Sequence, residues 1–257
     1  MPSILFEIKD SIACITLNRP EKYNAFNREM ALLMQEKLEE CKNKNIRCVY
    51  ITGAGKAFSS GQDLDEVVDP NGPDLSTILG EHYNPIIRQL RKLEKPVVAA
   101  VNGVAAGAGA NIALCCDVVL ASQSASFLQA FSKIGLIPDS GGTYILPRLI
   151  GWQKASALMM LGEKISAQDA ERMGMIYKIF PDDMFQQEAM NIATILSQMP
   201  TKGLALTKQI LNSSMVNNYD DQLHDEELFQ ERAGKTYDFK EGVRAFLEKR
   251  KPNFKGE

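Results

Sequence analysis

Histidine is scarce in this chain: His82 and His224 are the only two among 257 residues. His82 falls in a polar, turn-prone stretch and His224 in an acidic helical pattern, so we expect both at the solvated surface. This scarcity nearly excludes Ser-His-Asp and Cys-His mechanisms and His-rich metal sites. If the protein is an enzyme, we expect its acid–base chemistry to rest on carboxylates.

The chain also lacks cysteines at metal-binding or disulfide spacings, and it lacks long apolar runs. The five cysteines are odd in number, scattered and without C-x-x-C spacing: Cys14, Cys41, Cys48, Cys115 and Cys116. This argues against a disulfide framework and a zinc site, so we predict no metal. Residues 1–10 lack the basic and apolar regions of a signal peptide, and no apolar run approaches membrane-spanning length. We therefore expect a cytoplasmic protein with no membrane partner.

An excess of positive charge is absent as well. The formal net charge is −3, and acidic clusters occur at 220–221 and 225–227, so we expect no nucleic-acid partner. Hydrophobic residues make up 45% of the chain and charged residues 24%, as in ordinary globular proteins. The chain is therefore long enough and apolar enough to bury a large core.

Hydrophobic periodicity predicts an α/β body followed by a helical region. Strands are expected at 4–9, 12–17, 48–52, 96–101, 117–121 and 176–180, and helices at 30–41, 75–93, 107–114, 152–161, 166–173 and 183–199. Only helices are expected beyond Pro200, at 203–214, 222–234 and 239–249. We therefore divide the chain into a core at 1–199 and a C-terminal helical region at 200–257.

Two glycine-rich turns follow buried strands and lead toward helices. One lies between Gly53 and Leu64, and the other between Asn102 and Asn111. Turns of this kind expose free backbone N–H groups, and the helix dipole adds partial positive charge. If the two turns face each other, they can hold an oxygen that becomes negative during a reaction. The alternative is that the glycines only permit close helix packing.

One carboxylate stands out in residues 135–143. Asp139 follows an apolar run and Pro138, and it precedes a glycine-containing turn that opens a predicted helix. Aspartate often accepts backbone N–H groups as a helix N-cap, so Asp139 is a candidate cap. This segment alone favours the cap over a catalytic acid or base, and the two roles can coexist.

The ordered motifs of the chain resemble the crotonase, or enoyl-CoA hydratase/isomerase, superfamily. The matching segments lie at 17–20, 24–25, 55–64 (Gly-Lys-Ala-Phe-Ser-Ser-Gly-Gln-Asp-Leu), 95–103, 117, 135–143 and 246–250. The resemblance implies a spiral of ββα units with a C-terminal helical trimerisation region. It also implies an acyl-CoA thioester substrate, no separate cofactor, and a homotrimer or a dimer of trimers.

The resemblance also implies roles for individual residues. The oxyanion hole would consist of the backbone N–H groups of Gln62 and Ala108. The CoA contacts would be Lys22, Asn24, Ala25, Lys56, Phe58 and, from a neighbouring helix, Phe246 and Lys249. Each lysine has the alternative of being a solvated surface charge. The acyl pocket would contain Tyr83, Asn111 and Phe131, and Tyr83 has the alternative of simple packing.

The departures from the family pattern shape the functional prediction. The two glutamates of a hydratase fall on Asn111 and Phe131, neither of which can act as a base. Asp139 is the remaining carboxylate, at a position where several isomerases of the superfamily carry their acid–base residue. A single carboxylate can remove a proton and return it to another carbon.

We therefore predict a cofactor-free isomerase of an aromatic-derived acyl-CoA. The alternative is a Δ3,Δ2-enoyl-CoA isomerase of fatty-acid degradation. An enoyl-CoA hydratase, a thioester hydrolase and an RNA-binding relative are less favoured.

Overall fold

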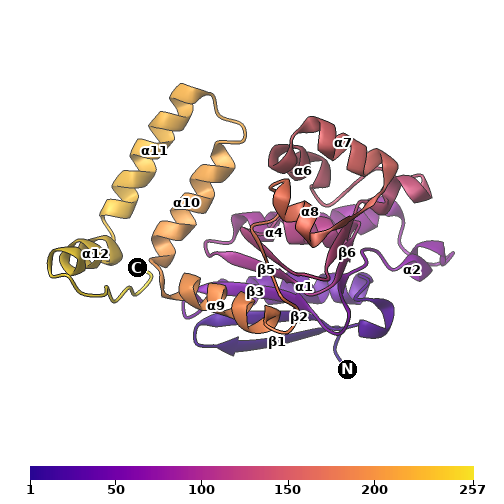
Figure 1. Ribbon diagram of the computed structural model, residues 1–257, viewed down its shortest axis with the longest axis horizontal. Helices are drawn as coiled ribbons and strands as arrows, with labels where there is room; N and C mark the ends of the chain where they lie inside the picture. The colour runs from indigo at the N-terminus through magenta and orange to yellow at the C-terminus, as the bar shows by residue number, and fades with distance from the viewer.

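Two β-sheets form the larger part of the computed structural model, which describes residues 1–257 (Figure 1). In spatial order, the large sheet contains β1 (Ile4–Lys9), β2 (Ile12–Leu17), β3 (Cys48–Gly53), β5 (Val97–Val101), β7 (Val118–Ser122) and β10 (Lys178–Phe180). β1 pairs with β2 as an antiparallel hairpin, and the other neighbours are parallel. The small sheet contains β4 (Ala57–Ser59), β6 (Val104–Ala106), β8 (Ser126–Leu128) and β9 (Lys164–Ser166).

The chain alternates between these two sheets. β3, β5 and β7 lie in the large sheet, and each is followed by a short strand, β4, β6 or β8, in the small sheet. A helix or a helical turn follows each pair before the chain returns to the large sheet. This arrangement is a spiral of ββα units, and it confirms the fold expected from the resemblance.

Helices surround the sheets and continue beyond them. They are α1 (Arg28–Glu40), α2 (Leu64–Val68), α3 (Leu75–Thr77), α4 (Asn84–Lys92), α5 (Ala108–Leu114), α6 (Gly142–Ile150), α7 (Trp152–Leu161), α8 (Ala167–Arg172), α9 (Phe185–Gln198), α10 (Thr201–Ser213), α11 (Tyr219–Gly234) and α12 (Tyr237–Leu247). Two 3-10 helices, η1 (Pro20–Lys22) and η3 (Ala130–Ile134), and one π-helix, η2 (Ile78–Tyr83), complete the set.

The large sheet is buried on both faces. Successive residues of β2 belong to different cores, since Ala13 packs in the main cluster of 42 residues and Ile12 in a second cluster of 11. Phe185 and Ala189 of α9 belong to the second cluster, so α9 covers the outer face of the sheet. Burial on both faces explains why the parallel strands are apolar throughout.

The structure refines several predicted elements. The four strands of the small sheet were not predicted, because each has only three residues and shows no periodicity. The helix expected at 75–93 is divided into α3, the π-helix η2 and α4. The N-cap of α1 is Asn27, whose side chain accepts a hydrogen bond from the Met30 N–H at 3.0 Å.

The C-terminal helices differ in how they attach to the core. Lys208 of α10 donates to Asp117, next to β7, at 2.8 Å, and this ion pair fixes α10 to the sheet. In contrast, α11 and α12 extend away from both sheets (Figure 1). The division of the chain at residue 200 stays a prediction. No helix combines the length and the apolar composition needed to cross a bilayer.

His82 is the clearest error of the sequence analysis. It was expected at the surface, but it is only 1% exposed and lies in the π-helix η2. Neither of its ring nitrogens has a hydrogen-bond partner. Burial lowers the pKa of His82 below its ordinary value, Arg28 adds to this effect, and Glu66 and Glu81 oppose it. His224 is exposed, as expected.

Acid should therefore destabilise the fold through His82. An unfolded histidine takes up a proton near pH 6.5, whereas the folded His82 resists it, so stability is lost as the pH falls below about 6.5. We expect His82→Gln to flatten the pH dependence of the free energy of unfolding, measured with urea between about pH 7.5 and 5.5. His224→Gln is the matched control and should keep the wild-type slope. An unchanged slope in His82→Gln would contradict this assignment.

Candidate active site

The turns that follow β4 and β6 lie against each other. Gly61 has a φ of +91° and Gly107 a φ of +53°, a region that glycine adopts readily. A Cβ added to Gly61 would lie 2.9 Å from the carbonyl oxygen of Ala106 and 3.3 Å from the backbone nitrogen of Ala108. Because this contact leaves no room for a side chain, glycine at position 61 is what lets the two turns meet.

Each turn contributes one free backbone donor. Ala108 is the first residue of α5, where an N–H group has no acceptor within the helix. Gln62 follows Gly61 in an isolated bridge with Phe26, and its N–H donates to no backbone carbonyl. The turns that hold the two predicted oxyanion donors are therefore adjacent in space.

Asp139 is partly buried in the loop before α6. Burial raises the pKa of this carboxyl, and the hydrogen bond from the Ser140 hydroxyl, at 2.9 Å, opposes the shift. The predicted capping role is wrong: α6 begins after Gly141, whose φ is +75°, and no side chain caps the helix. In this turn the Asp139 carbonyl accepts from the Gly142 N–H, and the Asp139 side chain accepts from the Ser140 hydroxyl but from no backbone N–H of α6.

Tyr83 bonds to Gln62 in the first glycine turn and also lies near Asp139. Its side chain is 1% exposed, and its hydroxyl donates to Oε1 of Gln62 at 3.0 Å. Burial raises the pKa of Tyr83 well above its ordinary value, and the negative charge of Asp139 adds to this effect. The phenol therefore lies within electrostatic reach of Asp139, beside the Gln62 side chain.

Two further carboxylates near Tyr83 have strong partners. Asp63 forms an ion pair with Arg19 at 2.7 Å. Glu66, which the sequence analysis missed, accepts from the Arg28 N–H and from the Gln62 amide, both at 2.9 Å. Asp139 has no cationic partner, and its side chain accepts only from the Ser140 hydroxyl, so burial raises the pKa of its carboxyl. No group of three or more His, Cys, Asp and Glu side chains is arranged to hold a metal ion.

Asn111 supports the Asp139 loop instead of lining a pocket. It is fully buried in α5, and its amide donates to the backbone carbonyl of Asp139 at 2.9 Å. Gln129 donates in turn to Oδ1 of Asn111 at 2.8 Å. The prediction that Asn111 faces the acyl group is therefore corrected: both ends of its amide are engaged within the protein. Nothing in the sequence pointed to Gln129.

Phe131 lies in η3 beside the second glycine turn. Its ring is buried, and a Cβ added to Gly107 would lie 3.7 Å from the ring edge. The side chain therefore places an apolar surface next to the turn that presents the Ala108 N–H. Its predicted place in an acyl pocket is compatible with this location.

The predicted CoA contacts fall into two groups. Lys22 and Lys56 are exposed, and Lys22 forms an ion pair with Asp65 at 2.6 Å. Asn24 and Phe58 have no exposed side-chain surface, and the Asn24 amide bonds to the carbonyls of Ala54 and Ala57. The side chains of Asn24 and Phe58 are therefore structural, which corrects their predicted contact with CoA. Ala25 is buried next to them.

Phe246 and Lys249 do not reach this site within one chain. Phe246 belongs to α12 and is 82% exposed, and Lys249 follows the helix. α12 and α2 lie at opposite ends of the molecule (Figure 1). Phe246 and Lys249 are therefore distant from the predicted site of their own chain.

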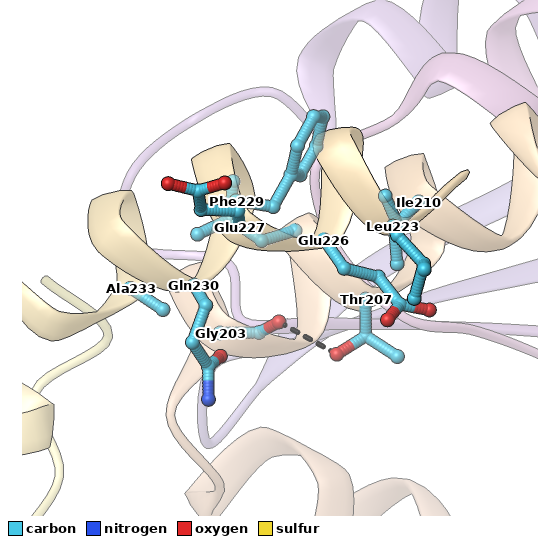
Figure 2. Close-up of a pocket in the computed structure, with 10 residues that line it drawn as sticks. Gly203, Thr207, Ile210, Leu223, Glu226, Glu227, Phe229, Gln230 and Ala233 are labelled. Carbon is cyan, nitrogen blue, oxygen red and sulfur yellow. Dashed lines mark hydrogen bonds between the residues drawn. The ribbon is translucent and has the colours of Figure 1, made fainter. Parts of the chain in front are cut away.

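A cavity of about 500 Å³ between α10 and α11 is separate from this site. Figure 2 shows residues that line it, among them Glu226, Glu227 and Gln230 of α11 and Gly203 and Thr207 of α10. The hydrogen bond drawn there joins the Thr207 hydroxyl to the Gly203 carbonyl within α10. None of the predicted site residues lines this cavity.

The fold and the paired glycine turns are of the crotonase type, and the comparisons agree. The family model for enoyl-CoA hydratase/isomerase matches residues 7–257, so the chain belongs to this family. It is 48% identical to the 1,2-epoxyphenylacetyl-CoA isomerase of Escherichia coli over 260 residues, which cover 100% of this chain and 99% of the relative.

Two further comparisons show the range of the family. A protein of Rhodobacter capsulatus, described as a probable enoyl-CoA hydratase, is 43% identical over 254 residues, with 99% of this chain and 98% of the relative covered. The crystal structure of an enoyl-CoA hydratase from Bacillus anthracis superimposes with a TM-score of 0.92 at 31% identity. It covers 99% of this chain and 100% of that one. Both hydratases and isomerases are therefore similar to this protein.

Replacement of Gly61 should separate the two turns. We expect Gly61→Ala to lower kcat by about 100-fold or more, as for the loss of an oxyanion donor, because the new Cβ pushes against Ala106 and Ala108. Turnover of an acyl-CoA thioester measures the effect, and circular dichroism checks the fold. Gly234→Ala is the control, since a Cβ there meets no atom within 4 Å. Equal activities of the two variants would contradict the proposed oxyanion geometry.

Loss of the Asn111 amide should displace Asp139. Asn111→Ala removes one of the two donors to the Asp139 carbonyl and leaves the Gln129 amide without its partner, so we expect a stability loss of about 1–3 kcal/mol. We also expect kcat to fall more than KM changes, because the base moves while the oxyanion turns stay. The exposed Asn45→Ala is the control. A stability loss with unchanged kcat would limit Asn111 to a structural role.

Proposed function

We propose that this protein is an acyl-CoA isomerase that converts 2-(1,2-epoxy-1,2-dihydrophenyl)acetyl-CoA into the corresponding oxepin-CoA. The observation that carries the proposal is a partly buried carboxylate without a cationic partner, Asp139, near two adjacent turns with free N–H groups. The 48% identity to the Escherichia coli 1,2-epoxyphenylacetyl-CoA isomerase, over the full chain, supports the choice of substrate.

In this proposal Asp139 transfers the proton. Its carboxylate removes a proton from the carbon next to the thioester carbonyl, and the negative charge moves to the thioester oxygen. The N–H groups of Gln62 and Ala108 stabilise that oxygen as an enolate. As the six-membered ring expands to the oxepin, the carbon–carbon bond that it shares with the epoxide breaks, and protonated Asp139 returns the proton to a ring carbon of the same substrate. Its raised pKa makes it a stronger base than an ordinary aspartate.

The alternative is a shift of a 3-enoyl double bond to the 2-position. The same residues serve this reaction, because it also needs one proton removed and one returned beside an enolate. It differs only in the acyl group that the pocket accepts.

Hydration is the second candidate function, since the Rhodobacter capsulatus relative is described as a probable hydratase. A hydratase needs a second group to position water. Asn111 is engaged with Gln129 and Asp139, and Phe131 is apolar. These contacts favour isomerisation over hydration.

We further propose that the chain assembles into a homotrimer or a dimer of trimers. Phe246 and Lys249 are exposed and distant from their own site, and Leu247 beside them is 75% exposed. A neighbouring subunit's site would explain both the exposure and the predicted CoA contact.

A substrate panel with an Asp139 variant tests the proposed reaction. We expect purified wild type to turn over the ring epoxide, and Asp139→Asn to lose about 100-fold or more of kcat. Because burial raises the pKa of Asp139, its ionised form costs stability near pH 7, so Asp139→Asn should be at least as stable as wild type. Thermal unfolding measures this second effect. Asp183→Asn, on an exposed carboxylate, is the control for both measurements.

Each outcome of this panel has a definite meaning. Turnover of a 3-enoyl-CoA without turnover of the ring epoxide would contradict the proposed epoxide substrate and favour the double-bond shift. Water addition to a 2-enoyl-CoA as the main activity would contradict isomerisation. Full activity of Asp139→Asn on any substrate would remove Asp139 from the mechanism.

A further inference from the structure

A basic cavity of about 380 Å³ lies where the core meets the C-terminal helices. Of its 13 lining residues, seven are cationic and one, Glu94, is acidic. The cations are Lys42, Lys44, Arg47, Lys92, Lys95, Lys202 and Lys255. The whole chain has 29 basic and 32 acidic residues, so this cavity departs sharply from the average composition.

Two of the cations are fixed in the wall of the cavity. Lys95 is only 7% exposed, and its ammonium donates to the carbonyl of Cys41 at 2.5 Å and to that of Asn43. Arg47 donates to the hydroxyl of Thr201 at 3.0 Å and to the carbonyl of Met199 at 2.7 Å. Because no carboxylate pairs with either group, their positive charges are not neutralised within the protein.

Other cations at the rim are available to a ligand. Lys44, Lys92 and Lys202 are exposed and form no ion pair. Lys42 is paired with Glu39, and the Lys255 ammonium lies over the ring of Tyr237 at 4.4 Å. The free lysines can therefore turn toward a bound anion without breaking an existing ion pair.

The N-terminus of α10 adds a second, independent source of positive potential. The helix has 13 residues and begins at Thr201, and Thr201 and Lys202 both line the cavity. Its N-cap is Pro200, which provides no side-chain hydrogen bond, and no acidic residue lies in the first turn. The helix dipole at this end is therefore uncompensated, and free N–H groups at a helix N-terminus favour anions such as phosphate.

The cavity is separate from the proposed acyl-CoA site. Arg47 and Lys95 precede β3 and β5, at the amino ends of these parallel strands. Lys22 and Lys56 follow β2 and β3, at the carboxyl ends. Neighbouring parallel strands have their amino ends at one edge of the sheet and their carboxyl ends at the other, so the two sets of lysines lie at opposite edges.

We propose that this cavity binds a small anion with two or more linked phosphates. Its volume accommodates a diphosphate or triphosphate group, and seven cations suit a ligand with several negative charges better than a single carboxylate. Arg47 also donates to the Phe254 carbonyl in the C-terminal tail. The bound anion therefore stabilises the contact between the core, α10 and the tail.

Calorimetric titration with inorganic pyrophosphate and with triphosphate tests the proposal. We expect binding at one site per chain, and we expect the double variant Lys44→Gln/Lys92→Gln to raise Kd by about tenfold or more, because two of the free charges are lost. A rise in the thermal unfolding midpoint on ligand addition is the second measurement. The matched control is Lys154→Gln/Lys164→Gln, which removes two exposed lysines elsewhere.

Three outcomes would overturn the proposal. One is the absence of binding up to about 10 mM ligand. Another is an equal loss of affinity in the two double variants, which would indicate only nonspecific charge attraction. The third is displacement of pyrophosphate by CoA together with loss of binding in Lys22→Gln, which would assign the ligand to the acyl-CoA site.

Discussion

The close approach of two backbone turns is the constraint on which the rest of the site depends. Because β4 and β6 pair in parallel, the turns that follow them leave the small sheet side by side. The two turns are so close that there is no room for a Cβ at Gly61. There is also none at Gly109, where a Cβ would lie 2.6 Å from Ser59. The site is thus organised by main chain, and the nearby side chains fit around that arrangement.

Asp139 is placed through the same elements. α5 begins at the second turn, and Asn111, three residues into the helix, reaches the Asp139 carbonyl. Gly142 must be glycine here, since a Cβ would lie 2.3 Å from the Asn111 amide. One short helix therefore connects the predicted oxyanion donor, at its first residue, with the loop that carries the carboxylate. Preorganisation of this kind keeps donors and base in a fixed relation.

Sequence reasoning was sufficient for the features that depend on local pattern. The long periodic helices and the apolar parallel strands were predicted. The glycine turns indicated free backbone donors, and the family resemblance named Gln62 and Ala108 as those donors. Features that depend on distant partners were not accessible. Gln129 is 18 residues from Asn111 in sequence, and His82 is buried by packing that no local pattern reveals. Asp139 was found by elimination of other bases, while its capping role was inferred from a preference that the Gly141 turn overrides.

The residue at position 111 affects both the conformation of the Asp139 loop and the reaction that the site can perform. The resemblance places a hydratase glutamate at this position, but here the side chain must donate to the carbonyl of Asp139. An ionised carboxylate has no hydrogen-bond donor. At position 111 one carboxylate oxygen would face the carbonyl oxygen of Asp139, and the Gln129 amide would be the only hydrogen-bond partner of the carboxylate. A base at 111 and the present conformation of the Asp139 loop therefore exclude each other. The amide holds the loop, and the loop carries a partly buried carboxylate without a cationic partner, which suits proton transfer within one substrate better than activation of a water molecule.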